Sequence, residues 1–167
     1  LILKYKPKNH TLFLKKKFEK LNYKKLEKYN LHNANISDYS SVIARNSSIR
    51  RILKKFQKNF SKKYRNCCIE GRDISTKILP SSDLKFFFCC SLKVAASRRY
   101  KELKKLDKSI SLKGVKKSLR KRNFLDINRK NSPLLKHRDS VVIDTGKLSK
   151  QAMLKKMSKY LERFLTK

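Results

Sequence analysis

The sequence of 167 residues predicts an α/β fold with a mainly parallel sheet flanked by helices. Short apolar runs alternate with longer stretches in which apolar residues recur every three or four positions. Each apolar run is also followed by a polar cluster, and parallel sheets bind ligands beyond the carboxyl ends of their strands. With 39% hydrophobic residues, including 7 Tyr and 9 Phe, the chain has enough apolar material for a core.

The first clear helix is predicted from Ser48 onward. Before it, the first 40 residues are rich in lysine and only weakly patterned. Apolar residues then recur at Ile49, Leu53 and Phe56, at helical spacing. Ser47 or Ser48 is the expected N-cap, because a hydroxyl can accept a bond from an N–H of the first turn.

Three strands and three further helices follow in the predicted order. The strands are expected at residues 67–69, 84–90 and 141–143, of which the second is expected to be buried. Ser91 is expected to cap a helix reaching about Leu106, a second helix covers about residues 111–128, and Ser149 is expected to cap the last. The polar residues after the three strands therefore meet at one edge of the sheet, provided that the strands are neighbours.

The net charge of +34, from 46 Lys and Arg against 12 Asp and Glu, allows two interpretations. A basic surface of this size favours a polyanionic partner such as nucleic acid. A lysine-dominated chain with 3 Gly and no Trp is also typical of a low-GC coding sequence, and this favours lysines that form a solvated shell.

The four cysteines occur as two adjacent pairs, Cys67-Cys68 and Cys89-Cys90. Neither pair has the spacing of a zinc site, and the three histidines are scattered. Both pairs lie in apolar runs, which predicts buried thiols in strands and no metal site. Reduced thiols indicate a cytoplasmic protein, and the sequence has no run of 18 apolar residues and no signal peptide.

The segment Glu70-Gly71-Arg72-Asp73 is the first candidate binding motif, because a preceding strand would hold its side chains towards a ligand. Asp73 could accept a hydrogen bond from an exocyclic amine, and Arg72 could reach a phosphate or a base. Alternatively, Arg72 and Asp73 simply pair with each other.

A second candidate motif consists of Arg122, Asp126 and Arg129, which stand at i, i+4 and i+7 and so share one helix face. Such a face takes an anion and also offers one acceptor. The alternative is a solvated stripe of salt bridges.

Two further motifs lie near helix starts. Arg98 and Arg99 follow the Phe-rich strand and could neutralise phosphates, which the arginine fork binds with two bonds. Their alternative role is an ordinary basic surface. Ser41 and Arg50 could together hold a sugar or a base.

These motifs, in this order, resemble the cytidylate kinase family from about residue 36 to the end of the chain. The matching segments are Ser41-x-x-Ala44, Ile49-Arg50, Leu53, Gln57, Glu70-Gly71-Arg72-Asp73-Ile74-Ser75-Thr76, Pro80, Lys85-Phe86-Phe87, Arg98-Arg99-Tyr100, Arg122-x-x-x-Asp126-x-x-Arg129, Ser132-Pro133-Leu134 and Ile143-Asp144-Thr145-x-x-Leu148-Ser149. Each segment is modest by itself, but their colinear order makes the combined signal strong.

The resemblance implies a nucleoside-monophosphate kinase fold of the P-loop type and phosphoryl transfer from Mg²⁺-bound ATP to CMP or dCMP. Residues 1–47 would be a partial nucleoside-monophosphate-binding insertion, and residues 48–167 the kinase core with a lid at about 98–122. The implied contacts are Arg50, Asp73 and Arg129 around cytosine, with Arg72 beside them; Ser41, Arg122 and Asp126 on the sugar; and Arg98 and Arg99 on the ATP phosphates. The implied catalytic residues are Arg99, Arg122 and Arg129.

The sequence departs from the family pattern at Glu70, Ser75, Asn123 and Ala95, which puts efficiency in doubt. The largest departure is the absence of the family's Gly-rich phosphate loop, since the only glycines in the sequence are Gly71, Gly114 and Gly146. The expectation is a fragment without the first strand and that loop, and with little or no activity alone.

Two other functions stay open: a small basic RNA-binding protein, and a decayed, non-catalytic relative of the kinases. The kinase interpretation predicts ATP and CMP or dCMP as partners, no specific nucleic acid, no membrane, and a monomer.

Overall fold

The computed structural model describes residues 5–19, 34–43, 46–64 and 66–166. Two compact units make up the chain, Leu1–Ile69 and Glu70–Lys167. The functional division expected after residue 47 rests on nucleotide binding rather than on compactness, so it stays a prediction.

Three helices form the described part of the first unit: α2 (His10–Glu19), α4 (Ala34–Ile43) and α5 (Ser47–Lys63). Leu14 of α2 and Ile49 of α5 are buried at its centre. The rings of Phe18 and Phe56 lie 4.9 Å apart, so the apolar face of α5 packs against α2. The helix predicted from Ser48 is therefore confirmed, and burial of its apolar face stabilises it.

The N-cap predicted for this helix was wrong. Asn46, and not Ser47 or Ser48, caps α5: its backbone is extended and its side-chain oxygen accepts a bond of 3.1 Å from the N–H of Ile49. Asn caps a helix as well as Ser does, and the residue that keeps non-helical dihedrals takes this position.

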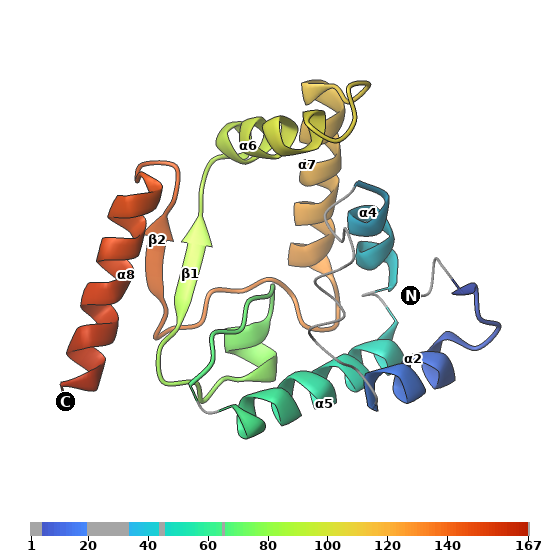
Figure 1. Cartoon of the computed structure of the whole chain (residues 1–167), viewed down its shortest axis with the longest axis horizontal. Coiled ribbons are helices and arrows are strands. Elements are labelled where there is room, and N and C mark those ends of the chain that lie inside the picture. Colours follow the sequence, from blue (N-terminus) through green and yellow to red (C-terminus); the bar gives the residue numbers. More distant parts are fainter. Residues whose placement is uncertain (1–4, 20–33, 44–45, 65, 167) are drawn as a thin grey trace. The chain divides into compact units, whose positions relative to one another are not determined.

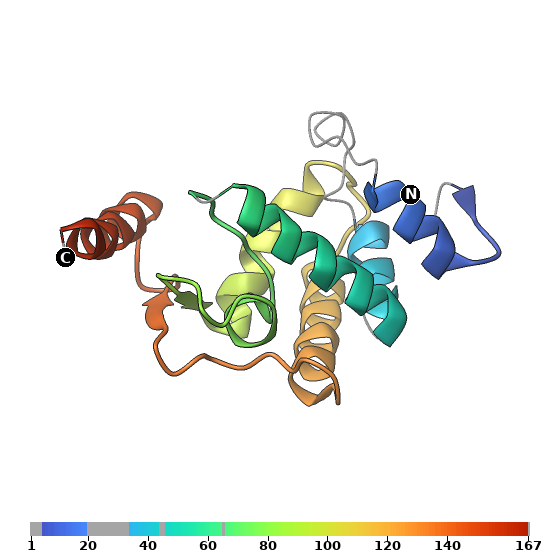
Figure 2. The ribbon, with the colours of Figure 1, turned by 90° about the horizontal axis from the view of Figure 1, so that it is seen from below.

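The second unit contains a parallel pair of strands with helices along the chain between and after them (Figures 1 and 2). Its elements are η1 (Ile74–Ile78), β1 (Phe86–Cys89), α6 (Leu92–Lys104), α7 (Leu112–Asn128), β2 (Val141–Asp144) and α8 (Lys150–Leu165). Phe86 pairs with Val141 and Cys89 with Asp144 in parallel register. The predicted α/β class with a parallel sheet is confirmed.

Serines cap the three long helices of this unit. Ser91, Ser111 and Ser149 have extended backbones, and each hydroxyl accepts a bond from the N–H three residues later. The predictions for Ser91 and Ser149 are confirmed. Helix α6 ends at Lys104, two residues short of the expected Leu106, which is 58% exposed.

Ile143 of β2 is wholly buried, and the other buried apolar residues described in this unit are Ile78, Ala96, Leu103 and Val115. Helices α6 and α7 pack against each other, and α8 lies alongside β2 in Figure 1, with the ring of Tyr160 6.3 Å from that of Phe86. None of the described helices is both long and apolar enough to cross a membrane.

The expected strand at residues 67–69 is absent, which corrects the prediction. In the described ranges only β1 and β2 pair, and Cys67 and Cys68 are exposed rather than buried. A run of three apolar residues cannot become a strand without a neighbour that satisfies its backbone groups.

The Phe-rich strand is shorter and more exposed than predicted. It covers Phe86–Cys89, and Phe88 is 49% exposed, while Cys89 and Cys90 are half-buried. Full burial of a strand needs cover on both of its faces, and the described residues cover this strand only in part.

Candidate active site

Five charged side chains from two separate segments meet in the second unit. We call them the charge cluster: Arg72, Asp73, Arg122, Asp126 and Arg129. Asp126 lies at its centre, with its carboxylate oxygens 3.4 Å from Nε of Arg72, 3.9 Å from Nε of Arg122 and 3.2 Å from Nη1 of Arg129. The structure thus brings together the two motifs that the sequence singled out separately.

The ion pairs cross between the two motifs. Arg72 reaches Asp126 on α7, and Asp73 lies 3.7 Å, Oδ1 to Nη2, from Arg129. Local pairing of Arg72 with Asp73 was the alternative, but these contacts instead tie the turn before η1 to the end of α7. Residues that are far apart in sequence therefore depend on each other for charge balance.

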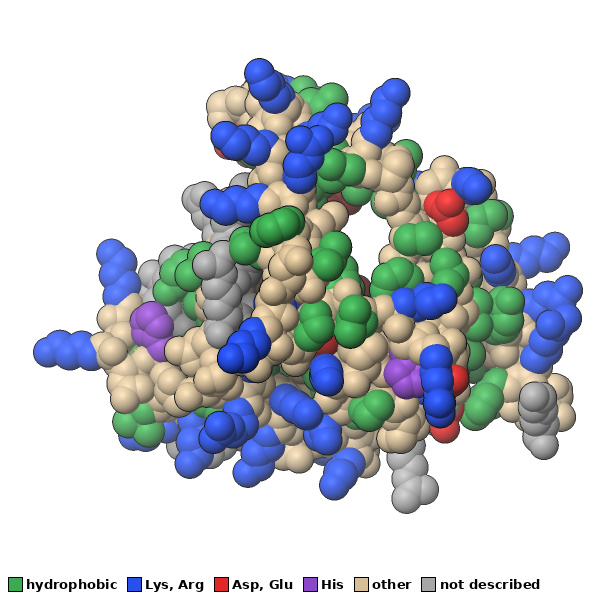
Figure 3. Space-filling model, turned by 180° about the vertical axis from the view of Figure 1, so that it is seen from behind, with side chains coloured by type: hydrophobic (Ala, Val, Ile, Leu, Met, Phe, Trp, Pro, Cys, Tyr) green, Lys and Arg blue, Asp and Glu red, His purple; other side chains and the backbone are tan. Residues whose placement is uncertain are grey.

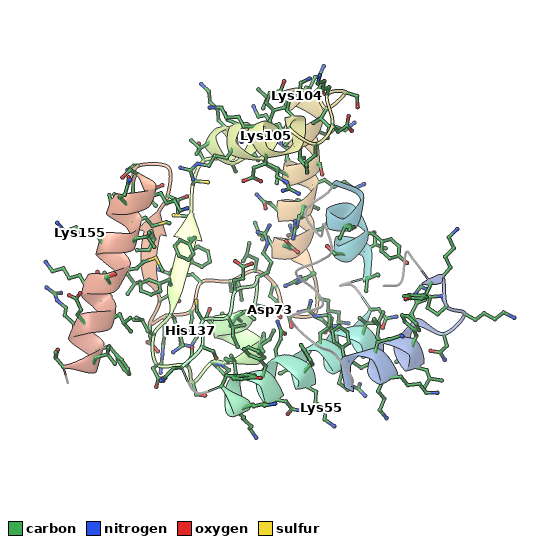
Figure 4. The ribbon with its side chains drawn as sticks, viewed as in Figure 1. Lys55, Asp73, Lys104, Lys105, His137 and Lys155 are labelled. Carbon is green, nitrogen blue, oxygen red and sulfur yellow. The ribbon has the colours of Figure 1, made fainter. Side chains whose placement is uncertain are left out.

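The turn that carries Asp73 is tight. The carbonyl of Asp73 accepts bonds from the N–H groups of Lys77 (2.9 Å) and Ile78 (3.3 Å), which close the short π-helix η1. A Cβ at Gly71 would lie 2.8 Å from Cγ1 of Ile74, closer than carbon atoms pack, so a larger residue here would force the Ile74 side chain to move. Figure 4 labels Asp73 at the start of η1.

The end of α7 positions Arg129. The helix stops at Asn128, and Arg129 is its extended C-cap, so this residue lies just outside the expected helix face. Its Nε donates to the carbonyl of Ser132, and the N–H of Leu134 donates to the carbonyl of Asp126 over 2.7 Å. Ser132 has φ of 57°, a left-handed conformation that lets the chain reverse before Pro133.

Burial gives the cluster its electrostatic character. Asp73 and Asp126 are each 7% exposed, so the second motif is not a solvated stripe of salt bridges. Burial lowers the pKa of Arg72 below its usual value; Asp126 opposes this shift, and the charges of Arg122 and Arg129 lower the pKa further. Three guanidinium groups against two carboxylates leave an excess of positive charge, which favours an anionic ligand.

One acceptor in the cluster has unused capacity. Oδ2 of Asp126 has no contact with solvent and accepts no hydrogen bond from the described residues, although two arginines lie near it. Buried carboxylate oxygens are normally hydrogen-bonded. This oxygen can therefore accept a bond from a hydroxyl or N–H of a ligand.

The two arginines of α6 make contacts that the sequence did not reveal. Arg98 donates to Oγ1 (3.1 Å) and to the carbonyl (2.6 Å) of Thr145, whose own N–H donates to the carbonyl of Cys89. Arg99 pairs with Glu102 over 3.1 Å. The i, i+3 spacing of Arg99 and Glu102 was a usable signal, whereas Arg98 and Thr145 are joined only by the fold.

Ser41 and Arg50 belong to the first unit. Ser41 lies within α4, and its side chain is outside the described residues; Arg50 is half-buried on α5. Their expected places beside the sugar and the cytosine stay predictions.

The described side chains do not form a metal site. Within residues 5–19, 34–43, 46–64 and 66–166, no group of three or more His, Cys, Asp or Glu residues could hold an ion. Asp73 and Asp126, the carboxylates nearest the candidate site, face arginines instead. A magnesium ion held by protein ligands alone does not fit these residues.

Comparison with known proteins gives the family. The family model described as cytidylate kinase matches residues 4–163. Proteins named cytidylate kinase are similar: one from Clostridium botulinum (strain Langeland) is 37% identical over 131 residues, 78% of this chain and 58% of the relative. One from Clostridium tetani is 36% identical over 80% of this chain and 57% of its own length, and one from Rickettsia africae is 36% identical over 83% and 63%. The chain thus spans somewhat over half the length of these relatives, and it belongs to the cytidylate kinase family.

Proposed function

We propose that this chain belongs to an enzyme that transfers a phosphoryl group from ATP to CMP or dCMP, giving CDP or dCDP and ADP. The observation that carries the proposal is the charge cluster, in which three arginines surround two buried carboxylates and one carboxylate oxygen lacks a hydrogen bond. A nucleoside monophosphate offers the complementary groups: a phosphate for the excess positive charge, and hydroxyl and amino donors for the carboxylates. The names of the relatives support the same substrate class.

Each member of the cluster has a proposed role. Asp73 accepts a hydrogen bond from the exocyclic amine of cytosine, beside Arg129 and Arg50, and Arg72 contacts the base or the phosphate. Arg122 and Asp126, with Ser41, hold the sugar. Oδ2 of Asp126 lacks a hydrogen bond in the structure, and a sugar hydroxyl could donate one to it, which supports this role.

Phosphoryl transfer depends on positioning and on charge stabilisation in the transition state. In this proposal Arg98 and Arg99 serve the ATP phosphates, and Arg99, Arg122 and Arg129 stabilise the transferring group. Mg²⁺ would enter with ATP and would neutralise charge on the transferring phosphates. The segments at 1–47 and about 98–122 close over the nucleotides as insertion and lid.

The 167 residues by themselves contain no Gly-rich loop to hold ATP phosphates, and we propose that this chain alone turns over slowly or not at all. We further propose that it acts as a monomer in the cytoplasm. Its four cysteines are all free, which accords with a reducing compartment.

Calorimetric titration of the 167-residue chain with CMP and with UMP tests the base contact. Asp73 accepts from the amine of cytosine but faces a carbonyl in uracil, so CMP should bind at least about tenfold more tightly. The variant Asp73→Asn should weaken CMP binding and shrink the ratio between CMP and UMP.

Asp139→Asn is the matched control, since this carboxylate belongs to the same unit, is exposed and lies outside the cluster. It should leave both affinities unchanged. Equal binding of CMP and UMP to the wild-type chain, with no effect of Asp73→Asn, contradicts the proposed role. A coupled assay of ADP release with CMP tests turnover separately, and rapid turnover by these residues contradicts the proposed inactivity.

A further inference from the structure

Helix α7 has a second, outward surface that takes no part in the charge cluster. At 100° per residue, eight exposed side chains fall within about 140° of one another. We call this the outer face of α7, and it consists of Lys113, Lys116, Lys117, Arg120, Lys121, Phe124, Ile127 and Asn128. The only acid of the helix, Asp126, lies on the opposite side and is buried in the cluster.

The inner side of the same helix fixes this orientation. Val115 and Asp126 are buried, and Arg122 is half-buried against Asp126. Helix α6 also packs on α7. The helix therefore cannot rotate to hide its outer face, and the cations there remain in solvent.

Exposed aromatic rings also lie beside cations elsewhere, such as Tyr64 after α5 and Phe164 on α8, each 43% exposed. Phe124 has the most exposed ring among the described residues, at 64%, and it lies at the angular centre of the lysines of α7. On α5 the ring of Phe56 packs towards α2, and on α8 the ring of Tyr160 packs on Phe86. Figure 3 shows that Lys and Arg side chains are widespread on the molecule, so charge alone does not single out α7.

We propose that the outer face of α7 binds a single-stranded polynucleotide, with phosphates on the five cations and one base stacked on Phe124. Lysine acts as a compact point charge and suits phosphates without reading sequence. The cations from Lys113 to Lys121 extend over about 12 Å, at 1.5 Å per residue, and Phe124 lies one turn further. Cationic rows beside aromatic rings are how proteins bind single strands without sequence preference.

Two other polyanions fit this surface less well. In a duplex the bases are already stacked inside the helix and leave Phe124 without a partner. A helix that lies in a membrane interface separates its apolar face from its cations, whereas Phe124 stands among the cations of α7. No residue of the outer face belongs to the charge cluster, although Lys113 to Lys121 lie in the segment proposed above as the lid.

Fluorescence anisotropy with a labelled 12-nucleotide oligouridine tests the proposal on the 167-residue chain. Affinity should fall with salt with a log–log slope of about −3.5, that is, 0.7 for each of five phosphate contacts. An oligothymidine of the same length should bind within about threefold, because nothing on the face reads the 2′-hydroxyl. A duplex of the same length should bind more weakly.

The decisive variant replaces Lys113, Lys116, Lys117 and Lys121 with glutamate. It should weaken oligouridine binding by about 30-fold or more and reduce the slope by about 2.8, for four lost contacts. Its matched control is K54E/K55E/K58E/K62E, four exposed lysines of α5 with the same change in net charge. Lys55 projects outward from α5 in Figure 4. The control should keep the slope, and circular dichroism checks that both variants are folded.

Phe124→Ala should weaken binding about fivefold or more without changing the salt slope, and Phe124→Leu should do the same because it keeps apolar area but loses the ring. Equal losses in the α5 and α7 variants would mean that only overall charge matters, which overturns the proposal. Tighter binding to the duplex, or to vesicles containing phosphatidylserine, also overturns it. If the glutamate variant of α7 does not fold, the Phe124 variants alone decide.

Discussion

The charge cluster and the arginines of α6 use the same residue types in two different environments. In the cluster, Asp126 is 7% exposed and has three arginines within 4 Å (3.4, 3.9 and 3.2 Å). On α6, Arg99 pairs over 3.1 Å with Glu102, whose side chain is 65% exposed. Ion pairs of similar length therefore differ in interaction energy, because water screens the Arg99–Glu102 pair more strongly than the buried pairs of Asp126.

Removing one member of a buried ion pair should change the free energy of unfolding far more than removing one member of an exposed pair. A buried ion pair contributes little net stability over an apolar replacement, but removal of one member leaves the others uncompensated. Removing one member of an exposed pair changes the free energy of unfolding very little, since water replaces the missing partner. Variants that remove one charge at each place separate the two cases.

The largest effect is expected for Asp126→Asn. It leaves Arg72, Arg122 and Arg129 without their shared carboxylate, and the free energy of unfolding should fall by about 3 kcal/mol. Urea denaturation followed by circular dichroism measures the change. Glu102→Gln is the control and should stay within about 0.5 kcal/mol of the wild type. Equal losses in the two variants contradict the role assigned to burial.

An intermediate effect is expected for Arg98→Ala, which removes two hydrogen bonds to Thr145 at the end of β2. The free energy of unfolding should fall by about 1 kcal/mol, because these bonds are exposed and water partly replaces them. Arg98→Lys keeps the charge but loses the planar fork that reaches both oxygens, so it should recover only part of the loss. Full recovery by lysine would show that charge rather than geometry acts here.

The smallest effect concerns Asp107 in the turn after α6. Bonds from the side chain and backbone of Ser109 hold its pKa below the usual 3.8. A carboxyl with a lowered folded-state pKa stabilises the fold above 3.8, and this contribution is lost as the pH falls through the lowered pKa. The wild type should therefore exceed Asp107→Asn in stability at about pH 6, and the difference should shrink near pH 2.5. A difference that is constant with pH contradicts this assignment.

The sequence predicted those parts of the structure that depend on local periodicity. The helices at α5, α6, α7 and α8 follow from apolar spacing, and the caps Ser91 and Ser149 from their hydroxyls. The cap of α5 was missed because Asn46 and the two serines after it are similarly good N-caps. Only the backbone dihedrals of the folded chain decide which residue takes this position. The strand at 67–69 failed because a strand depends on a neighbour that local sequence does not supply.

For the candidate site, the sequence determined the members and the tertiary structure determined their pairing. Spacing placed Arg122 and Asp126 on one helix face, and colinear motifs indicated the family that the comparisons then showed. Only the fold decided that Arg72 faces Asp126 and that Asp73 faces Arg129, since those pairs join segments about fifty residues apart. It also decided that these carboxylates are buried while the lysines and Phe124 of α7 are exposed. Residue type sets which charges a chain carries, but burial sets how strongly they interact, and burial is a property of the packed chain.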